Sequence, residues 1–152
     1  MHGVDEQAAA LADAIEAALP AWVEGSVVRL MTAWKGDVDD DARAAAVVAG
    51  REAVAEVGPR VRALLEADID DQRTTPLSIV RAAVRFPTAV LQAAGVPPVR
   101  RDEQQERLFP DDVYDLAPAT FADVDPALAD VGLAWGAAKA YAHLQRHKVA
   151  NG

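Results

Sequence analysis

The sequence predicts an all-α fold, a bundle of four to five helices with a long ordered irregular segment packed across it. Three observations carry this prediction. Much of the 51% hydrophobic fraction is alanine, the best helix former, and only 5% of the 152 residues are aromatic. Apolar residues recur every three or four positions over most of the chain. Residues 96–125 break this pattern with several prolines. A chain of this length is normally one domain, which we expect to span residues 1–152.

The first third of the chain predicts two helices that meet at a proline. Apolar residues at helical spacing indicate one helix over residues 5–19 and another over residues 21–34. Pro20 lies between them, and a proline inside a helix removes a backbone hydrogen bond and breaks or kinks it. All three tryptophans fall on faces that we expect to be buried, namely Trp22, Trp34 and Trp135.

A third helix is predicted from the acidic residues after Gly36 to about Asp68, because negative charge suits a helix N-terminus. Its expected buried seam alternates three and four positions along Val47, Gly50, Val54, Val57, Val61 and Leu64. The spacing continues through Gly58 and Pro59. We therefore expect one kinked helix that keeps its register.

The fourth helix has clear boundary signals. Thr75 is a good N-cap, Pro76 suits the first helical position, and Gly95 can take the left-handed turn that ends a helix. This segment is apolar almost all round, so we expect it to be the central helix, bent at Pro87. One polar stripe remains on it, formed by Ser78, Arg81, Arg85, Thr88 and Gln92.

A final helix is predicted to begin with Asp125 as N-cap and Pro126 in its first turn, and to fray from about Lys148. Between the last two helices, residues 96–125 hold regularly placed apolar side chains. Disordered segments are poor in such anchors, so we expect an ordered strap laid over the bundle.

The sequence TTPLSIVRAAVRFPTAVLQAAGVPPVRRDEQQERLFPDDVYDLAPATFADVDPAL, followed by LAWGAAKAYAHLQRH, resembles the C-terminal half of a family of small uncharacterised helical proteins from high-GC actinobacteria. The similarity covers residues 74–147. It implies that the strap is a fixed element of the fold, and it implies no activity.

Arg81 and Arg85 lie one turn apart on the polar edge of the fourth helix. A buried arginine requires a carboxylate or an anionic ligand, because an unpaired buried charge is costly. One interpretation is an internal network with the acids of the strap. The alternative is a pocket for a carboxylate or phosphate, with candidate ligand-binding residues Arg81, Arg85, Arg100, Arg101 and Tyr114.

Metal-binding patterns are also present. Asp111, Asp112 and Asp115 have the Asp-Asp-x-x-Asp spacing that holds magnesium in prenyl-transferring enzymes, but they follow Pro110 and have no second acidic motif. His143 and His147 share a helix face, yet no glutamate follows His143 as in zinc proteases. We therefore predict no metal site and no cofactor, and we expect the two histidines to be a surface pair.

The net charge of −9 disfavours nucleic-acid and anionic-membrane partners. The absence of cysteine excludes disulfides and thiolate catalysis and fits a reducing compartment, so we expect a cytoplasmic location. Neither serine lies in a nucleophile elbow. The first hypothesis is a non-catalytic helical interaction or regulatory module that binds a protein partner or self-associates as a homodimer. The second is an enzyme or binding protein for a small anion held between residues 96–125 and Arg81/Arg85.

Overall fold

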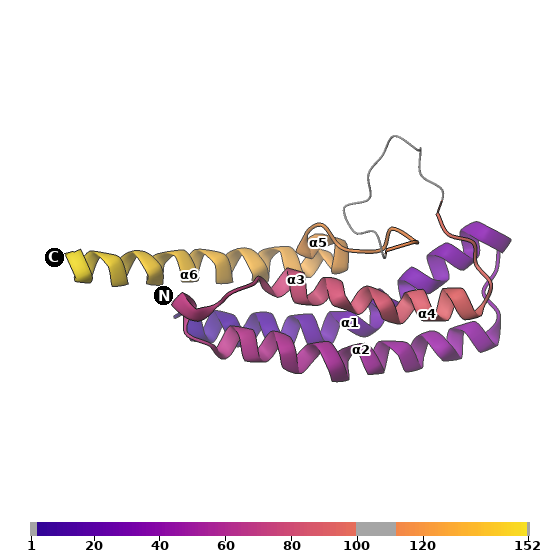
Figure 1. Ribbon diagram of the computed structural model, residues 1–152, viewed down its shortest axis with the longest axis horizontal. Helices are drawn as coiled ribbons and strands as arrows, with labels where there is room; N and C mark the ends of the chain where they lie inside the picture. Colours follow the sequence, from indigo (N-terminus) through magenta and orange to yellow (C-terminus); the bar gives the residue numbers. More distant parts are fainter. Residues whose placement is uncertain (1–2, 100–111, 152) are drawn as a thin grey trace.

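The computed structural model describes residues 3–99 and 112–151, and over these residues the chain is a bundle of helices without a strand, as the sequence predicts. The helices are α1 (Val4–Lys35), α2 (Asp40–Glu66), α3 (Pro76–Arg81), α4 (Arg85–Ala93), α5 (Phe121–Val124) and α6 (Pro126–Asn151). Two short 3-10 turns are η1 (Ile69–Asp71) and η2 (Ala82–Val84). Figure 1 shows α1 and α2 as a long hairpin, with α3 and α4 along it and α6 projecting past its end.

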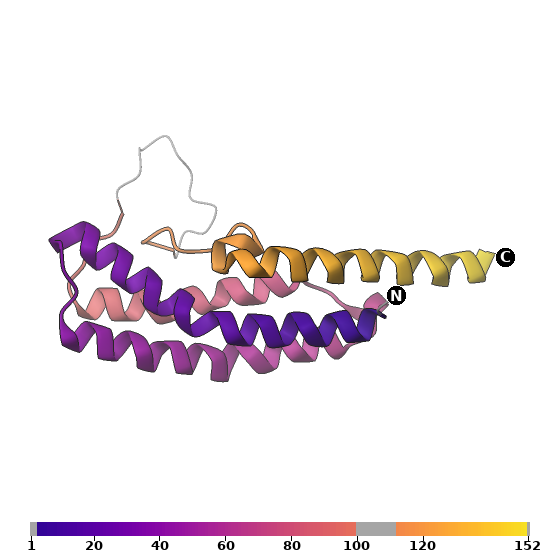
Figure 2. The same ribbon diagram turned by 180° about the vertical axis from the view of Figure 1, so that it is seen from behind.

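The first two predicted helices are one helix, α1, with Pro20 inside it. Figure 2 shows the bend near the middle of α1. The helix continues because fully buried side chains lie on both sides of the proline, including Leu19 and Val23, and packing at these positions offsets the missing hydrogen bond. Trp22 and Trp135 are buried as predicted. The prediction for Trp34 is wrong, because it lies in the last turn of α1 with 44% of its surface exposed.

The third predicted helix is α2, which continues through Pro59 as expected. Three residues of the predicted seam, Gly50, Val57 and Val61, are buried, but the seam as a whole is shifted toward small residues. Val47 is 38% exposed, and the face against α1 consists mainly of small residues: Ala42, Ala46, Ala49, Gly50, Ala53, Val57, Gly58, Val61 and Leu65. A Cβ placed on Gly50 would lie 3.1 Å from Cα of Pro20. The two helix backbones therefore lie very close together where the proline of α1 meets the glycine of α2.

The fourth predicted helix begins and ends as expected. Oγ1 of Thr75 accepts a hydrogen bond from the Ser78 amide at 3.2 Å, and Gly95 has a φ of 80°. The amides of Val96 and Gly95 donate to the carbonyls of Leu91 and Gln92 at 3.0 and 3.1 Å. These two bonds form a Schellman motif, which explains why the helix stops here.

Between its ends this segment is not one regular helix. The turn η2 separates α3 from α4, just before Pro87, whose ring nitrogen has no proton to donate. It is also not central. α1 contacts α2, α4 and α6, and it carries the largest set of fully buried side chains, so α1 is the centre of the bundle.

The strap region contains a short helix that the sequence did not indicate. Residues 121–124 form α5, and the side chains of Thr120 and Asp123 close a capping box at its start. Asp125 then begins α6, and its Oδ1 accepts from the Ala127 amide at 2.9 Å. The helix runs to Asn151, and fraying from Lys148 stays a prediction. Residues 100–111 of the predicted strap lie outside the described residues.

The close approach of α1 and α2 can be tested with two glycines. Gly50→Val should lower the free energy of unfolding by about 1–3 kcal/mol, because the added atoms would meet the Pro20 backbone. Gly25 lies in α1 with nothing within 4 Å of an added Cβ. Gly25→Ala should therefore raise the free energy of unfolding by about 0.5–1 kcal/mol. Urea unfolding measures both, and equal effects of the two substitutions would contradict the close contact.

Candidate functional site

Arg81 connects α3 to the end of the strap. Its Nε donates to the carbonyl of Pro118 at 2.9 Å, and its Nη2 donates to the carbonyl of Ala119 at 3.3 Å. The guanidinium group thus contacts backbone carbonyls of the strap. These contacts are to main-chain oxygens. Most of the strap acids that we considered as partners of Arg81 lie at positions 102–111, outside the described residues.

Arg85 contacts a different element. It forms an ion pair with Glu56 of α2, and its guanidinium carbon lies 4.6 Å from the ring centroid of Phe86. Its side chain is 58% exposed and borders an open groove of about 630 Å³ between α2 and α4. The structure therefore directs Arg81 toward the strap and Arg85 toward α2. Arg100 and Arg101 lie outside the described residues.

Tyr114 and Asp112 hold the end of the strap that the structure describes. The Tyr114 hydroxyl donates to the carbonyl of Val96 at 2.7 Å, and only 2% of this residue is exposed. Burial raises the pKa of the phenol. The two carboxylate oxygens of Asp112 accept from the amides of Leu116 and Ala117 at 2.9 and 2.8 Å. Both side chains thus satisfy backbone groups of an irregular segment.

The described residues of the Asp-Asp-x-x-Asp pattern, for which we predicted no metal site, lie in different environments. Asp112 is buried and bonded to the two amides, whereas Asp115 is exposed with a φ of 57°. Asp111 lies outside the described residues. The two described aspartates of the pattern therefore differ in burial.

The solvent face of α6 is a second surface of interest. Its core face holds Leu128 and Trp135, which are 1% and 8% exposed. On the opposite side, Leu133 and Leu144 are 74% and 67% exposed, and Ala137 and Ala140 between them are also exposed. The spacing of these four residues is four, three and four, which is the spacing of a coiled-coil seam.

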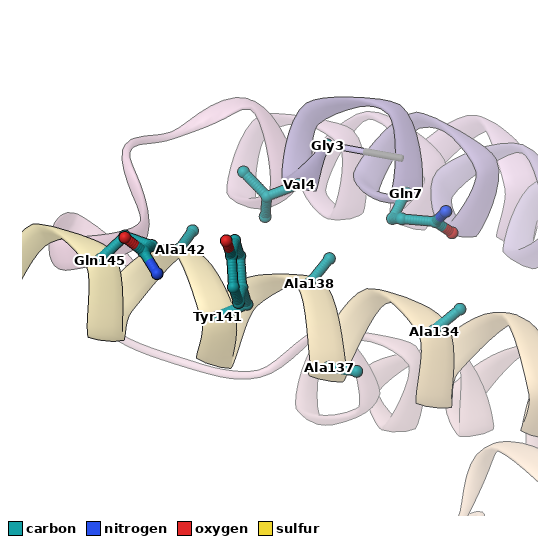
Figure 3. A pocket seen from close by; sticks show the side chains of 9 residues that line it. All are labelled: Gly3, Val4, Gln7, Ala134, Ala137, Ala138, Tyr141, Ala142 and Gln145. Atoms are coloured by element: carbon teal, nitrogen blue, oxygen red, sulfur yellow. The ribbon is translucent and has the colours of Figure 1, made fainter. Parts of the chain in front are cut away.

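An apolar groove of about 590 Å³ lies beside this face, between α6 and the start of α1. Figure 3 shows Val4 and Tyr141 pointing toward one another across it. Its lining residues are Gly3, Val4, Gln7, Ala134, Ala137, Ala138, Tyr141, Ala142 and Gln145. No charged side chain belongs to this lining, and Tyr141 is half exposed. The groove therefore continues the apolar surface of α6 rather than forming a polar pocket.

The C-terminal half of α6 is attached to η1 by charged side chains. Arg146 donates to both carboxylate oxygens of Asp68, at 2.6 and 3.0 Å, and to Oδ2 of Asp70 at 3.0 Å. These bonds raise the pKa of Arg146. The pKa of Asp68 is lowered, chiefly by the hydrogen bond from Arg146 and to a smaller extent by the hydrogen bond from the Asp70 amide. His143 Nδ1 lies 3.3 Å from Asp70 Oδ1, and its ring centroid lies 4.2 Å from that of His147.

Sequence reasoning missed this cluster because its acids and its bases come from segments that are more than seventy residues apart. Asp68 caps the turn η1 and Asp70 lies in it, whereas the bases belong to α6. The only signal was the shared face of His143, Arg146 and His147 on one helix.

No family model, curated protein or solved structure matches this chain. The resemblance of residues 74–147 to small actinobacterial proteins therefore stays a prediction. Within the part of the chain that the structure describes, no helix has both the length and the apolar character needed to cross a membrane.

The contact between α6 and η1 should depend on pH. The lowered pKa of Asp68 means that its contribution to stability is complete above its ordinary value of 3.8 and is lost as the pH falls through the folded value. Arg146→Gln should therefore destabilise the protein at neutral pH and have little effect in strong acid. Unfolding curves of the wild type and the variant across this range measure the difference.

Arg60→Gln is the matched control, because it removes the same positive charge from an exposed position on α2. An effect of Arg146→Gln that is independent of pH, or equal to that of Arg60→Gln, would contradict the assignment.

Proposed function

We propose that this protein is a non-catalytic helical interaction module that self-associates through the solvent face of α6. The observation that carries the proposal is the exposed line Leu133, Ala137, Ala140 and Leu144. Large exposed apolar side chains in a continuous patch are typical of interaction sites, and a three-four line on one helix suits a second helix.

Charge along α6 favours an antiparallel partner of the same sequence. Asp130 and Lys148 lie eighteen residues apart, which is five turns at 3.6 residues per turn, so they flank the apolar line on the same side. In an antiparallel pair, residues on the same flank of the two helices face one another. Asp130 then lies beside Lys148 of the partner subunit, and the symmetry of the dimer makes this ion pair twice.

The same register aligns the apolar residues. When Leu133 lies level with Leu144 of the partner subunit, Ala137 lies level with Ala140 of the partner subunit. The contact then has leucine pairs at its ends and alanine pairs at its centre, and alanine allows the two helices to approach closely. A contact made by one helix from each subunit is small compared with standard interfaces, so we expect a weak dimer that depends on concentration.

The alternative of a small anionic ligand has less support. Arg81 donates to strap carbonyls and Arg85 pairs with Glu56, so their contacts favour structural roles for both. The acidic, cysteine-free composition remains the basis for proposing a cytoplasmic location.

Sedimentation velocity over a wide concentration range tests self-association. Leu144→Glu should shift the equilibrium toward monomer by at least about tenfold in dissociation constant, because it places a charge in each apolar end layer. Val48→Glu is the matched control, since Val48 is 50% exposed on α2, away from α6. A wild type that stays monomeric at every concentration would overturn the proposal.

The direction of pairing has its own test. Asp130→Lys and Lys148→Asp should each weaken the dimer, because each places like charges side by side on the two subunits. The double substitution should restore the affinity, and failure to restore it would exclude the antiparallel register. Circular dichroism of each variant confirms that the monomer keeps its helical content.

A further inference from the structure

We propose that Asp70, His143 and His147 form a binding site for a divalent transition-metal ion, of which zinc is the best match. The three residues come from two elements, η1 and α6. One ligand atom from each lies within 4.8 Å of the others. Two imidazoles and one carboxylate are a ligand set that zinc accepts, with the fourth position open to water.

The spacing of the donor atoms suits a tetrahedral ion. With metal–ligand bonds of about 2.0–2.1 Å, a tetrahedral zinc ion holds its ligand atoms roughly 3.3 Å apart. His143 Nδ1 and Asp70 Oδ1 are already separated by 3.3 Å. His147 is one helical turn from His143, and their ring centroids are 4.2 Å apart, so a rotation of the exposed His147 side chain brings in the third donor.

Arg146 positions the carboxylate of Asp70 and leaves free the oxygen that would bind the metal ion. Arg146 bonds Oδ2 of Asp70, whereas the oxygen nearest His143 is Oδ1. The bidentate pair of Arg146 with Asp68 fixes η1 against α6 independently of Asp70. Hydrogen-bonded carboxylates of this kind orient metal ligands in known sites, and their loss weakens binding.

The choice of ion follows from ligand chemistry. Imidazole prefers zinc and its first-row neighbours, whereas magnesium and calcium prefer sites made of oxygen ligands. The three ligand residues are exposed, so the ion is reached directly from solvent and we expect micromolar rather than tighter affinity. An ion at this position links η1 to α6, and binding therefore stabilises the folded chain.

Isothermal titration of the full chain with zinc tests the site. We expect one ion for each chain and no heat signal with magnesium. Zinc at about one hundred times its dissociation constant should raise the melting temperature by roughly 5–10 °C. Cobalt, used as a probe, should give the visible absorption of a tetrahedral site.

Three substitutions distinguish the proposed ligand residues from neighbouring residues that do not bind the ion. His147→Ala and Asp70→Asn should each weaken zinc binding by at least about tenfold. In known sites, the loss of a residue that only hydrogen-bonds to a metal ligand already costs about 10–100-fold in affinity. Asp71→Asn is the matched control. Asp71 is an exposed carboxylate of the same turn, η1, and does not belong to the ligand group, so its substitution should leave the affinity almost unchanged.

His2 is the third histidine of the chain, and His2→Ala should leave binding unchanged. The proposal is overturned if zinc does not bind. It is also overturned if zinc binds equally well to His147→Ala, or if the number of bound ions falls with His2→Ala instead. Circular dichroism of each variant without metal shows whether a loss of binding comes from misfolding.

Discussion

The structure depends on the close contact between α1 and α2. At Pro20 and Gly50 the two backbones are so near that an added Cβ would lie 3.1 Å from a backbone atom. The α2 side of this contact is lined by alanine, which buries little area for each residue, so the hairpin needs great length to bury enough apolar surface. Arg62 of α2 also joins the two helices, because it donates hydrogen bonds to Asp13 and Glu16 of α1. These bonds raise the pKa of Arg62.

Two of the residues that we considered for an anion pocket, Arg81 and Tyr114, donate hydrogen bonds to backbone carbonyls. A segment without regular structure leaves amides and carbonyls that need partners. Asp112 accepts from two amides, the Tyr114 hydroxyl donates to the carbonyl of Val96, and the Val99 amide donates to the carbonyl of Val113 at 3.0 Å. Arg81 satisfies two more carbonyls near α5. The described ends of the strap are therefore tied to each other and to α3.

The helix α6 is used on more than one side. Its core face packs on α1, and Gly132 lets the ring of Phe121 approach so closely that an added Cβ would lie 2.5 Å from it. Arg146 on the same helix bonds η1, and the opposite face exposes two leucines. In the proposed dimer, this exposed face is the surface of α6 that contacts the second copy.

The sequence by itself determined the helical class, the caps at Thr75, Gly95 and Asp125, and the continuity of α2 through Pro59, because these depend on local backbone chemistry. Which helix is central was decided only by the tertiary structure. A local sequence pattern gives most weight to large apolar residues. It therefore predicted the buried face of α2 from its valines rather than its alanines, and it predicted residues 76–95 rather than α1 as the central helix. The meeting of Asp70 with His143 was equally invisible, since no local rule relates side chains that only the folded chain brings together.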